Sequence, residues 1–249
     1  MMKLRMPRKV DILGWLITPM RKIRGLFAPK SVLVLGDSHA SVFYHLSFDR
    51  AFPNYVFYLC SVGGATVSGL ENPNSKTQAY PRFESAIRRH PASAYITLLG
   101  EVDVGFVIWY RAQKYQVPVE QMLEQAVQKY ERLLRELRRR GPVIVISAPL
   151  PTIPDENPCG EVANLRREVK VSQRERTALT LLFNQRVREI CERIGAHFID
   201  LDAESLGEDG LVKKELLNKK PCDHHYDLSA YARMLIEKLR PLLLSDNLT

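Results

Sequence analysis

Residues 32–39 read Val-Leu-Val-Leu-Gly-Asp-Ser-His, a run of branched apolar residues that ends at a glycine, an acid, a serine and a histidine. Such a run bounded by glycine predicts a buried strand, and the apolar residues within 38–48 recur at helical spacing. Ser38 therefore lies at a predicted strand-to-helix turn. Backbone N–H groups at a helix N-terminus stabilise an anion or a carbonyl oxygen that becomes negative. The turn is a candidate active site, with a second interpretation in which Ser38 is only the helix N-cap.

Strand and helix patterns alternate along the rest of the chain. Strands are predicted at residues 31–35, 55–60, 94–99, 143–147 and 197–201, and helices at 77–90, 119–140, 173–194 and 229–244. The helix at 173–194 follows Ser172, which forms an S-x-x-E capping box with Glu175, and ends at Gly195. This alternation predicts an α/β fold, a three-layer α/β/α sandwich with a parallel, flavodoxin-like sheet of about five strands.

Residues that are candidates for catalysis follow several of these strands. Ser38, Gly64 and Asp103 each come after a predicted strand, and the segment 223–225, Asp-His-His, precedes the last helix. Ligands of an open parallel sheet bind at the carboxyl ends of its strands. We therefore expect these residues at one edge, where a nucleophile, a base and an acid are all available for acyl transfer.

In these blocks the chain resembles the SGNH hydrolase family, also called GDSL-like lipases and esterases. Residues 36–38, Gly-Asp-Ser, match the block that holds the nucleophilic serine, and Gly64 matches the oxyanion-hole glycine of the second block. Gly-Glu-Val-Asp at 100–103 falls on the third block, and Asp223 and His225 stand shortly before a terminal helix, as in the last block. The resemblance implies a serine-dependent ester hydrolase that acts through an acyl-enzyme on an ester of a carbohydrate or small molecule.

The same resemblance implies the residue roles. Ser38 attacks the carbonyl, His225 takes the serine proton and Asp223 orients the imidazole. The backbone N–H groups of Ser38 and Gly64 bind the oxyanion. The supporting residues are Asp37, His39, Asp103 and His224.

Two departures from the family pattern leave alternatives open. Val102 stands where the family has an asparagine that donates to the oxyanion, and Cys222 stands where the acid usually lies, three residues before His225. His224 remains an alternative base. The chain could also be a glycan- or acyl-binding protein without turnover, or an O-acyltransferase in which a sugar hydroxyl replaces water.

The basic charge is concentrated at the N-terminus. Residues 1–30 carry eight lysines and arginines against Asp11 alone, whereas the whole chain has a net charge of +8. The nearly neutral remainder argues against a nucleic-acid partner. We therefore divide the chain into a basic amphipathic arm, 1–30, and an SGNH-like domain, 31–249. The arm could lie on an anionic membrane surface, or pack on the domain or on a second subunit.

The arm has no pattern of a transmembrane or secretory segment. Its uncharged run at 12–20 is too short to span a bilayer, and no signal-peptide cleavage pattern follows it. We expect a cytoplasmic protein that can contact the inner membrane face. The sequence does not determine the oligomeric state.

The sequence predicts neither a metal nor another cofactor. Cys222, Asp223, His224 and His225 offer ligand types that metals accept, but ligands at consecutive positions point in different directions. Asp37 and His39 resemble the first block of calcineurin-like metallophosphoesterases, whose further blocks are missing here. Four cysteines in a chain of this length do not suggest a disulfide framework.

Overall fold

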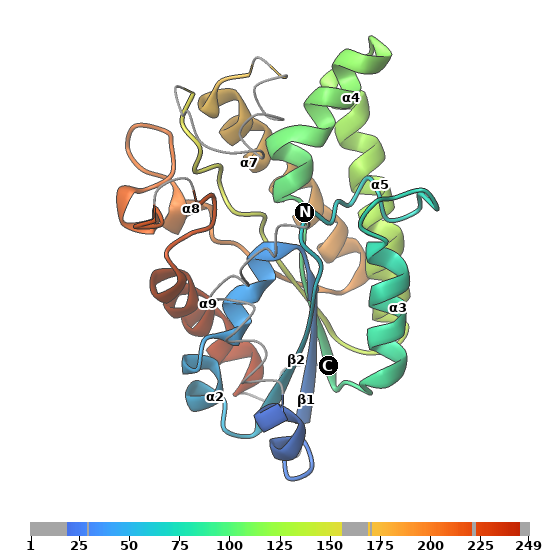
Figure 1. Cartoon of the computed structure of the whole chain (residues 1–249), viewed down its shortest axis with the longest axis vertical. Helices are drawn as coiled ribbons and strands as arrows, with labels where there is room; N and C mark the ends of the chain where they lie inside the picture. The colour runs from blue at the N-terminus through green and yellow to red at the C-terminus, as the bar shows by residue number, and fades with distance from the viewer. Residues whose placement is uncertain (1–18, 29, 156–168, 170, 221–222, 245–249) are drawn as a thin grey trace, which may run out of the picture.

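A five-stranded parallel sheet forms the centre of the computed structural model, which describes residues 19–28, 30–155, 169, 171–220 and 223–244 (Figure 1). The strands are β1 (Lys30–Gly36), β2 (Tyr55–Ser61), β3 (Ala94–Leu98), β4 (Val143–Ile146) and β5 (His197–Ile199). Their order is β2-β1-β3-β4-β5, and every neighbouring pair is parallel. This is the flavodoxin-like order, so the predicted fold class is confirmed.

Helices cover both faces of the sheet, because alternate residues of each strand point to opposite sides. Leu33 and Leu35 join the core under α3 (Ala79–Arg89), α5 (Val119–Arg138) and α7 (Gln173–Ile194). Val32 and Val34 join the core under the 3₁₀ helix η1 (Ser38–Tyr44), α2 (Ser47–Ala51) and α9 (Leu228–Leu243). Figure 1 shows α3 and α5 on one side of β1 and β2, and α2 and α9 on the other.

The helix ends follow their capping residues. The Ser172 side chain accepts a hydrogen bond from Glu175 N, and the Glu175 side chain accepts one from the backbone N–H of Ser172. The predicted capping box of α7 is therefore present. Gly195 ends α7 with a φ of 68°. Asp227 caps α9 by accepting from the N–H groups of Ser229 and Ala230. The remaining short helices are α8 (Asp202–Ser205) and η3 (Lys214–Leu216).

The aromatic segment after β3 is helical, although no helix was predicted there from the sequence. A π-helical turn, η2 (Asp103–Val107), leads directly into α4 (Ile108–Tyr115). Val104, Ile108 and Ala112 recur every four residues and are all buried, which is the spacing of one helix face. The abundance of aromatic residues obscured this apolar spacing.

The described part of the N-terminal arm is fixed to the domain by two arginines. Arg21 is buried and holds both carboxylate oxygens of Asp49, at 2.8 and 3.2 Å, and it also donates to the Phe57 carbonyl. Arg24 donates to Asp49 Oδ1 at 2.9 Å and to three carbonyl oxygens nearby. Residues 1–18 lie outside the described residues. Among those described, no helix has both the length and the apolar character needed to cross a bilayer.

Replacing Asp49 with alanine is expected to lower the free energy of unfolding by about 3–5 kcal/mol, because it leaves the Arg21 guanidinium buried without its carboxylate. Urea unfolding followed by circular dichroism measures the change. The control is Glu84→Ala, which removes an exposed pair with Arg88 and should cost less than about 1 kcal/mol. Equal losses in the two variants would contradict a structural role for the buried pair.

Candidate active site

Close backbone packing builds the turn that carries Ser38. A Cβ atom at Gly36 would lie 2.5 Å from the Leu98 carbonyl oxygen and 2.6 Å from the Ala40 Cβ, so the end of β1 accommodates only glycine. Asp37 N donates to that same Leu98 oxygen at 3.2 Å. The strand end, the neighbouring strand β3 and the first turn of η1 therefore meet at Ser38.

Asp37, and not Ser38, is the N-cap of η1. Its Oδ1 accepts from His39 N at 2.8 Å, and its carbonyl accepts from Ser61 Oγ at 2.7 Å, which ties the turn to the end of β2. Ser38 is half-buried at the first position of η1. Because Asp37 satisfies the cap, the interpretation of Ser38 as only a capping residue does not account for its hydroxyl.

Asp223 and His225 form a hydrogen-bonded acid–base pair. His225 Nδ1 lies 2.6 Å from Asp223 Oδ1, which also accepts from His225 N at 3.1 Å. The hydrogen bond from His225 lowers the pKa of Asp223 to about 2. The carboxylate is therefore ionised near neutral pH, and it favours the tautomer in which the neutral imidazole has its proton on Nδ1 and a lone pair on Nε2. That Nε2 is buried and has no hydrogen-bond partner among the described residues.

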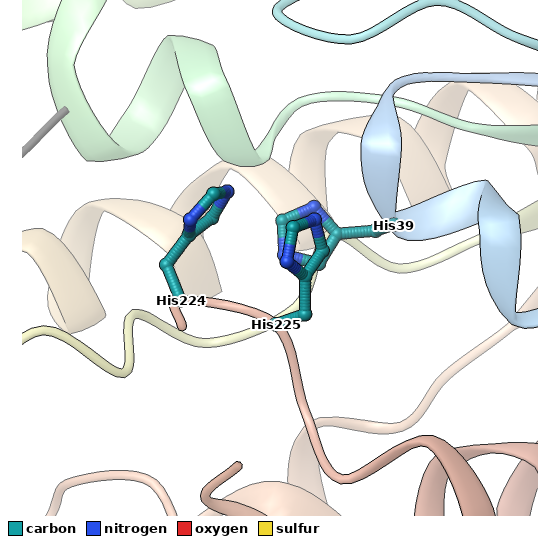
Figure 2. A group of neighbouring side chains, drawn as sticks. All are labelled: His39, His224 and His225. Carbon is teal, nitrogen blue, oxygen red and sulfur yellow. The ribbon is translucent and has the colours of Figure 1, made fainter. Parts of the chain in front are cut away.

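Three imidazoles bring the two ends of the chain together. The ring centroid of His39, the residue after Ser38, lies 4.6 Å from that of His225 and 5.5 Å from that of His224. The rings of His224 and His225 are 4.1 Å apart. Figure 2 shows His39 approaching from the turn after β1 and the other two from the segment before α9. The predicted nucleophile and base thus belong to segments in contact.

Asp103 fixes the loop that carries Gly64. Its buried carboxylate accepts from the N–H groups of Val67 and Ser68, at 2.7 and 3.0 Å, and from the Ser68 hydroxyl at 2.5 Å. Burial raises the pKa of Asp103, and these hydrogen bonds oppose the rise. Gly64 is exposed, with a φ of 73° that favours glycine. The geometry gives Asp103 a positioning role in the loop after β2.

Of the two positions that differ from the family pattern, the structure describes Val102 but not Cys222. Val102 lies in the turn before η2 and offers no side-chain donor, so the position where the family has an oxyanion-binding asparagine is apolar here. Cys222 lies outside the described residues. Asp223 precedes His225 by two residues instead of three, and its carboxylate still lies within hydrogen-bond distance of the His225 ring.

Two contacts that the sequence did not suggest hold the histidine segment against the chain after β4. Thr152 Oγ1 donates to the His224 carbonyl at 2.8 Å. The buried Tyr226 hydroxyl accepts from Leu150 N, also at 2.8 Å. The tyrosine directly after the histidine pair was visible in the sequence, but nothing local indicated its partner 76 residues away.

The buried acid Glu101 was also not predicted from the sequence as a residue of the site. It follows β3 immediately, within the block that ends at Asp103, and is only 2% exposed. Its charge is among the influences that raise the pKa of Tyr226, after burial. A buried carboxyl at the carboxyl end of a central strand adds negative potential to this edge of the sheet.

A family model for the SGNH domain (fused to AT3 domains) matches residues 17–208, more than half of the chain. The match ends before the histidine segment at 223–225. No curated protein sequence matches the chain.

Solved structures of esterases share the fold. A carbohydrate acetylesterase family member from Sinorhizobium meliloti is 16% identical over 86% of this chain and 99% of its own, with a TM-score of 0.57. An acetyl xylan esterase is 12% identical over 86% of this chain and 99% of its own, with a TM-score of 0.54. A catalytic mutant of an acetylxylan esterase from Geobacillus stearothermophilus is 16% identical over 87% and 94%, with a TM-score of 0.54.

Proposed function

Because the chain belongs to the SGNH domain family, we propose that it is a serine-dependent ester hydrolase that cleaves an acyl ester of a carbohydrate or another small molecule. The observation that carries the proposal is the hydrogen-bonded pair of Asp223 and His225, at 2.6 Å. The His225 ring contacts His39, the neighbour of Ser38. An imidazole held by a carboxylate, on a segment that contacts the strand-to-helix turn of a serine, supports activation of that hydroxyl as a nucleophile.

The proposed reaction has two acyl-transfer steps. His225 Nε2 takes the proton from Ser38 Oγ as the oxygen bonds to the ester carbonyl carbon, and the N–H groups of Ser38 and Gly64 stabilise the resulting oxyanion. The imidazolium then protonates the leaving alcohol as the carbon–oxygen bond breaks, which leaves an ester on Ser38. Water attacks this acyl-enzyme with His225 as base, and the acid and free serine are released. Throughout, the Asp223 carboxylate holds Nδ1 and balances the imidazolium charge.

A small acyl group on a sugar is the preferred substrate class. Proteins named as acetyl xylan esterases and a carbohydrate acetylesterase share this fold. Their identity to this chain is low, so the substrate class is part of the proposal. Contact of the arm with a membrane and cytoplasmic residence likewise remain predictions.

Labelling of the full-length protein with a fluorophosphonate, followed by p-nitrophenyl acetate hydrolysis, tests the proposed function. We expect one covalent adduct, located by peptide mass spectrometry on Ser38, and the loss of nitrophenol release in proportion to labelling. A folded protein that neither labels nor hydrolyses the ester would favour the binding-protein alternative. Acetylation of an added sugar in place of hydrolysis would favour the O-acyltransferase alternative.

A further inference from the structure

The geometry points to a zinc site formed by His39, His224 and His225, in which the metal shares His225 with the proposed esterase centre and blocks it. Zinc binding follows from the side chains alone. The block on hydrolysis rests on the proposed function.

The three histidines are close enough to bind one ion. One ring nitrogen of each lies within 4.8 Å of those of the other two. Nitrogens bound to a tetrahedral zinc at about 2.0–2.1 Å are about 3.4 Å apart, so the rings need to close by little more than 1 Å. His224 and His225 are half-buried. Figure 2 shows the His224 ring next to those of His39 and His225, which overlap in this view.

Two of the histidines are already oriented by carboxylates. His225 Nδ1 lies 2.6 Å from Asp223 Oδ1 and His39 Nδ1 lies 3.2 Å from Asp37 Oδ1. Histidines that bind metals usually donate their other ring nitrogen to a carboxylate or carbonyl, which fixes the tautomer and makes Nε2 a better ligand. Since His225 Nε2 is buried and has no hydrogen-bond partner among the described residues, its lone pair is available to a cation.

The set of ligands indicates the metal and its effect. Three imidazoles with one position left open match the ligand count of zinc sites that keep an exchangeable ligand. In the sequence, His39 and the histidines at 224 and 225 belong to two separate candidate metal blocks, each of them incomplete, whereas the fold brings the three rings together. A zinc ion on His225 Nε2 occupies the lone pair that must accept the Ser38 proton, so binding and hydrolysis exclude each other.

Metal binding is measured first and without any activity assay. The metal-free full-length protein is titrated with Zn²⁺ against a chromophoric chelator, and with Co²⁺ as a spectroscopic probe. We expect one ion per chain and a cobalt spectrum of a tetrahedral site with nitrogen and oxygen ligands. His39→Ala and His224→Ala should each weaken zinc binding at least about 10-fold, whereas His197→Ala, a histidine on β5 outside the cluster, should not change it.

Three results would overturn the site. The first is a wild-type affinity that survives His39→Ala and His224→Ala in variants whose circular dichroism is native. The second is a sulfur-to-cobalt charge-transfer band, which would show a thiolate among the ligands. Absence of any binding would overturn it as well.

Ester hydrolysis then tests the shared base. We expect Zn²⁺ to inhibit p-nitrophenyl acetate hydrolysis with a half-inhibitory concentration equal to the dissociation constant from the titration, and a chelator to restore the rate. Zinc that binds through the three histidines without inhibiting an active enzyme would overturn the block. A wild-type protein that binds zinc but shows no ester hydrolysis would contradict the proposed function and leave the zinc site supported.

Discussion

Replacing Ser38 with alanine is expected to lower kcat/KM for p-nitrophenyl acetate about 10⁴- to 10⁶-fold, because the variant retains the base and the oxyanion donors but has no nucleophile. The main chain of the turn should not change, since Gly36 and the Asp37 cap build it without the serine hydroxyl. Initial rates on purified protein, with circular dichroism and thermal unfolding to confirm the fold, measure the effect.

Ser41→Ala is the matched control for Ser38→Ala. It removes a hydroxyl from the same helix, one that donates to the Ser38 carbonyl at 2.6 Å, and one such hydrogen bond is worth about 1 kcal/mol. We expect a rate within about 10-fold of wild type. Comparable rates for Ser38→Ala and wild type would show that the hydrolysis uses another nucleophile.

Replacing His225 with alanine is expected to cost a similar 10⁴- to 10⁶-fold, about as much as loss of the serine, because the two residues act as a unit. His224→Ala should cost far less. The structure favours His225, since Asp223 Oδ1 lies 2.6 Å from Nδ1 of its ring, while the His224 carbonyl accepts from Thr152 Oγ1. The comparison of kcat for the two variants at equal pH separates the candidate bases.

The reverse order of losses would assign the base to His224. Asp223→Asn gives an independent check, because an amide cannot select the same tautomer or stabilise the imidazolium. We expect it to lower kcat about 10⁴-fold with little change in KM. A change confined to KM would instead place Asp223 in substrate binding.

Local patterns were sufficient to predict the fold. The five strands are short apolar runs bounded by turn residues. The predicted helix at 119–140 has a long amphipathic pattern, and the one at 173–194 has a capping box and a terminal glycine, so few alternatives competed with them. The helix α4 was missed because its apolar spacing is divided among aromatic residues. The cap at Asp37 was missed because a serine and an aspartate next to each other are both good capping residues.

The candidate site was predictable in its parts but not in its assembly. Ser38, Asp223 and His225 could be recognised because they lie in short motifs that contain a nucleophile, an acid and a base. The contact of His39 with His224 and His225 spans almost the whole chain and depends on how β1 and the segment before α9 meet at the sheet edge. The pair formed by Arg21 and Asp49 was not predicted either, because the sequence left open whether the basic arm lies on a membrane, packs on the domain or packs on a second subunit.

The anchoring of the N-terminal segment places its exposed apolar side chains away from the proposed active site. Arg21 and Arg24 attach this segment near the first residue of β1, while Ser38 follows the last residue of that seven-residue strand, roughly 20 Å away. Residues 19–28, which expose the apolar side chains of Met20, Ile23, Leu26 and Phe27, form the blue segment at the lower end of the molecule in Figure 1. A surface that binds these side chains therefore contacts the domain far from Ser38, and binding there leaves the proposed active site uncovered.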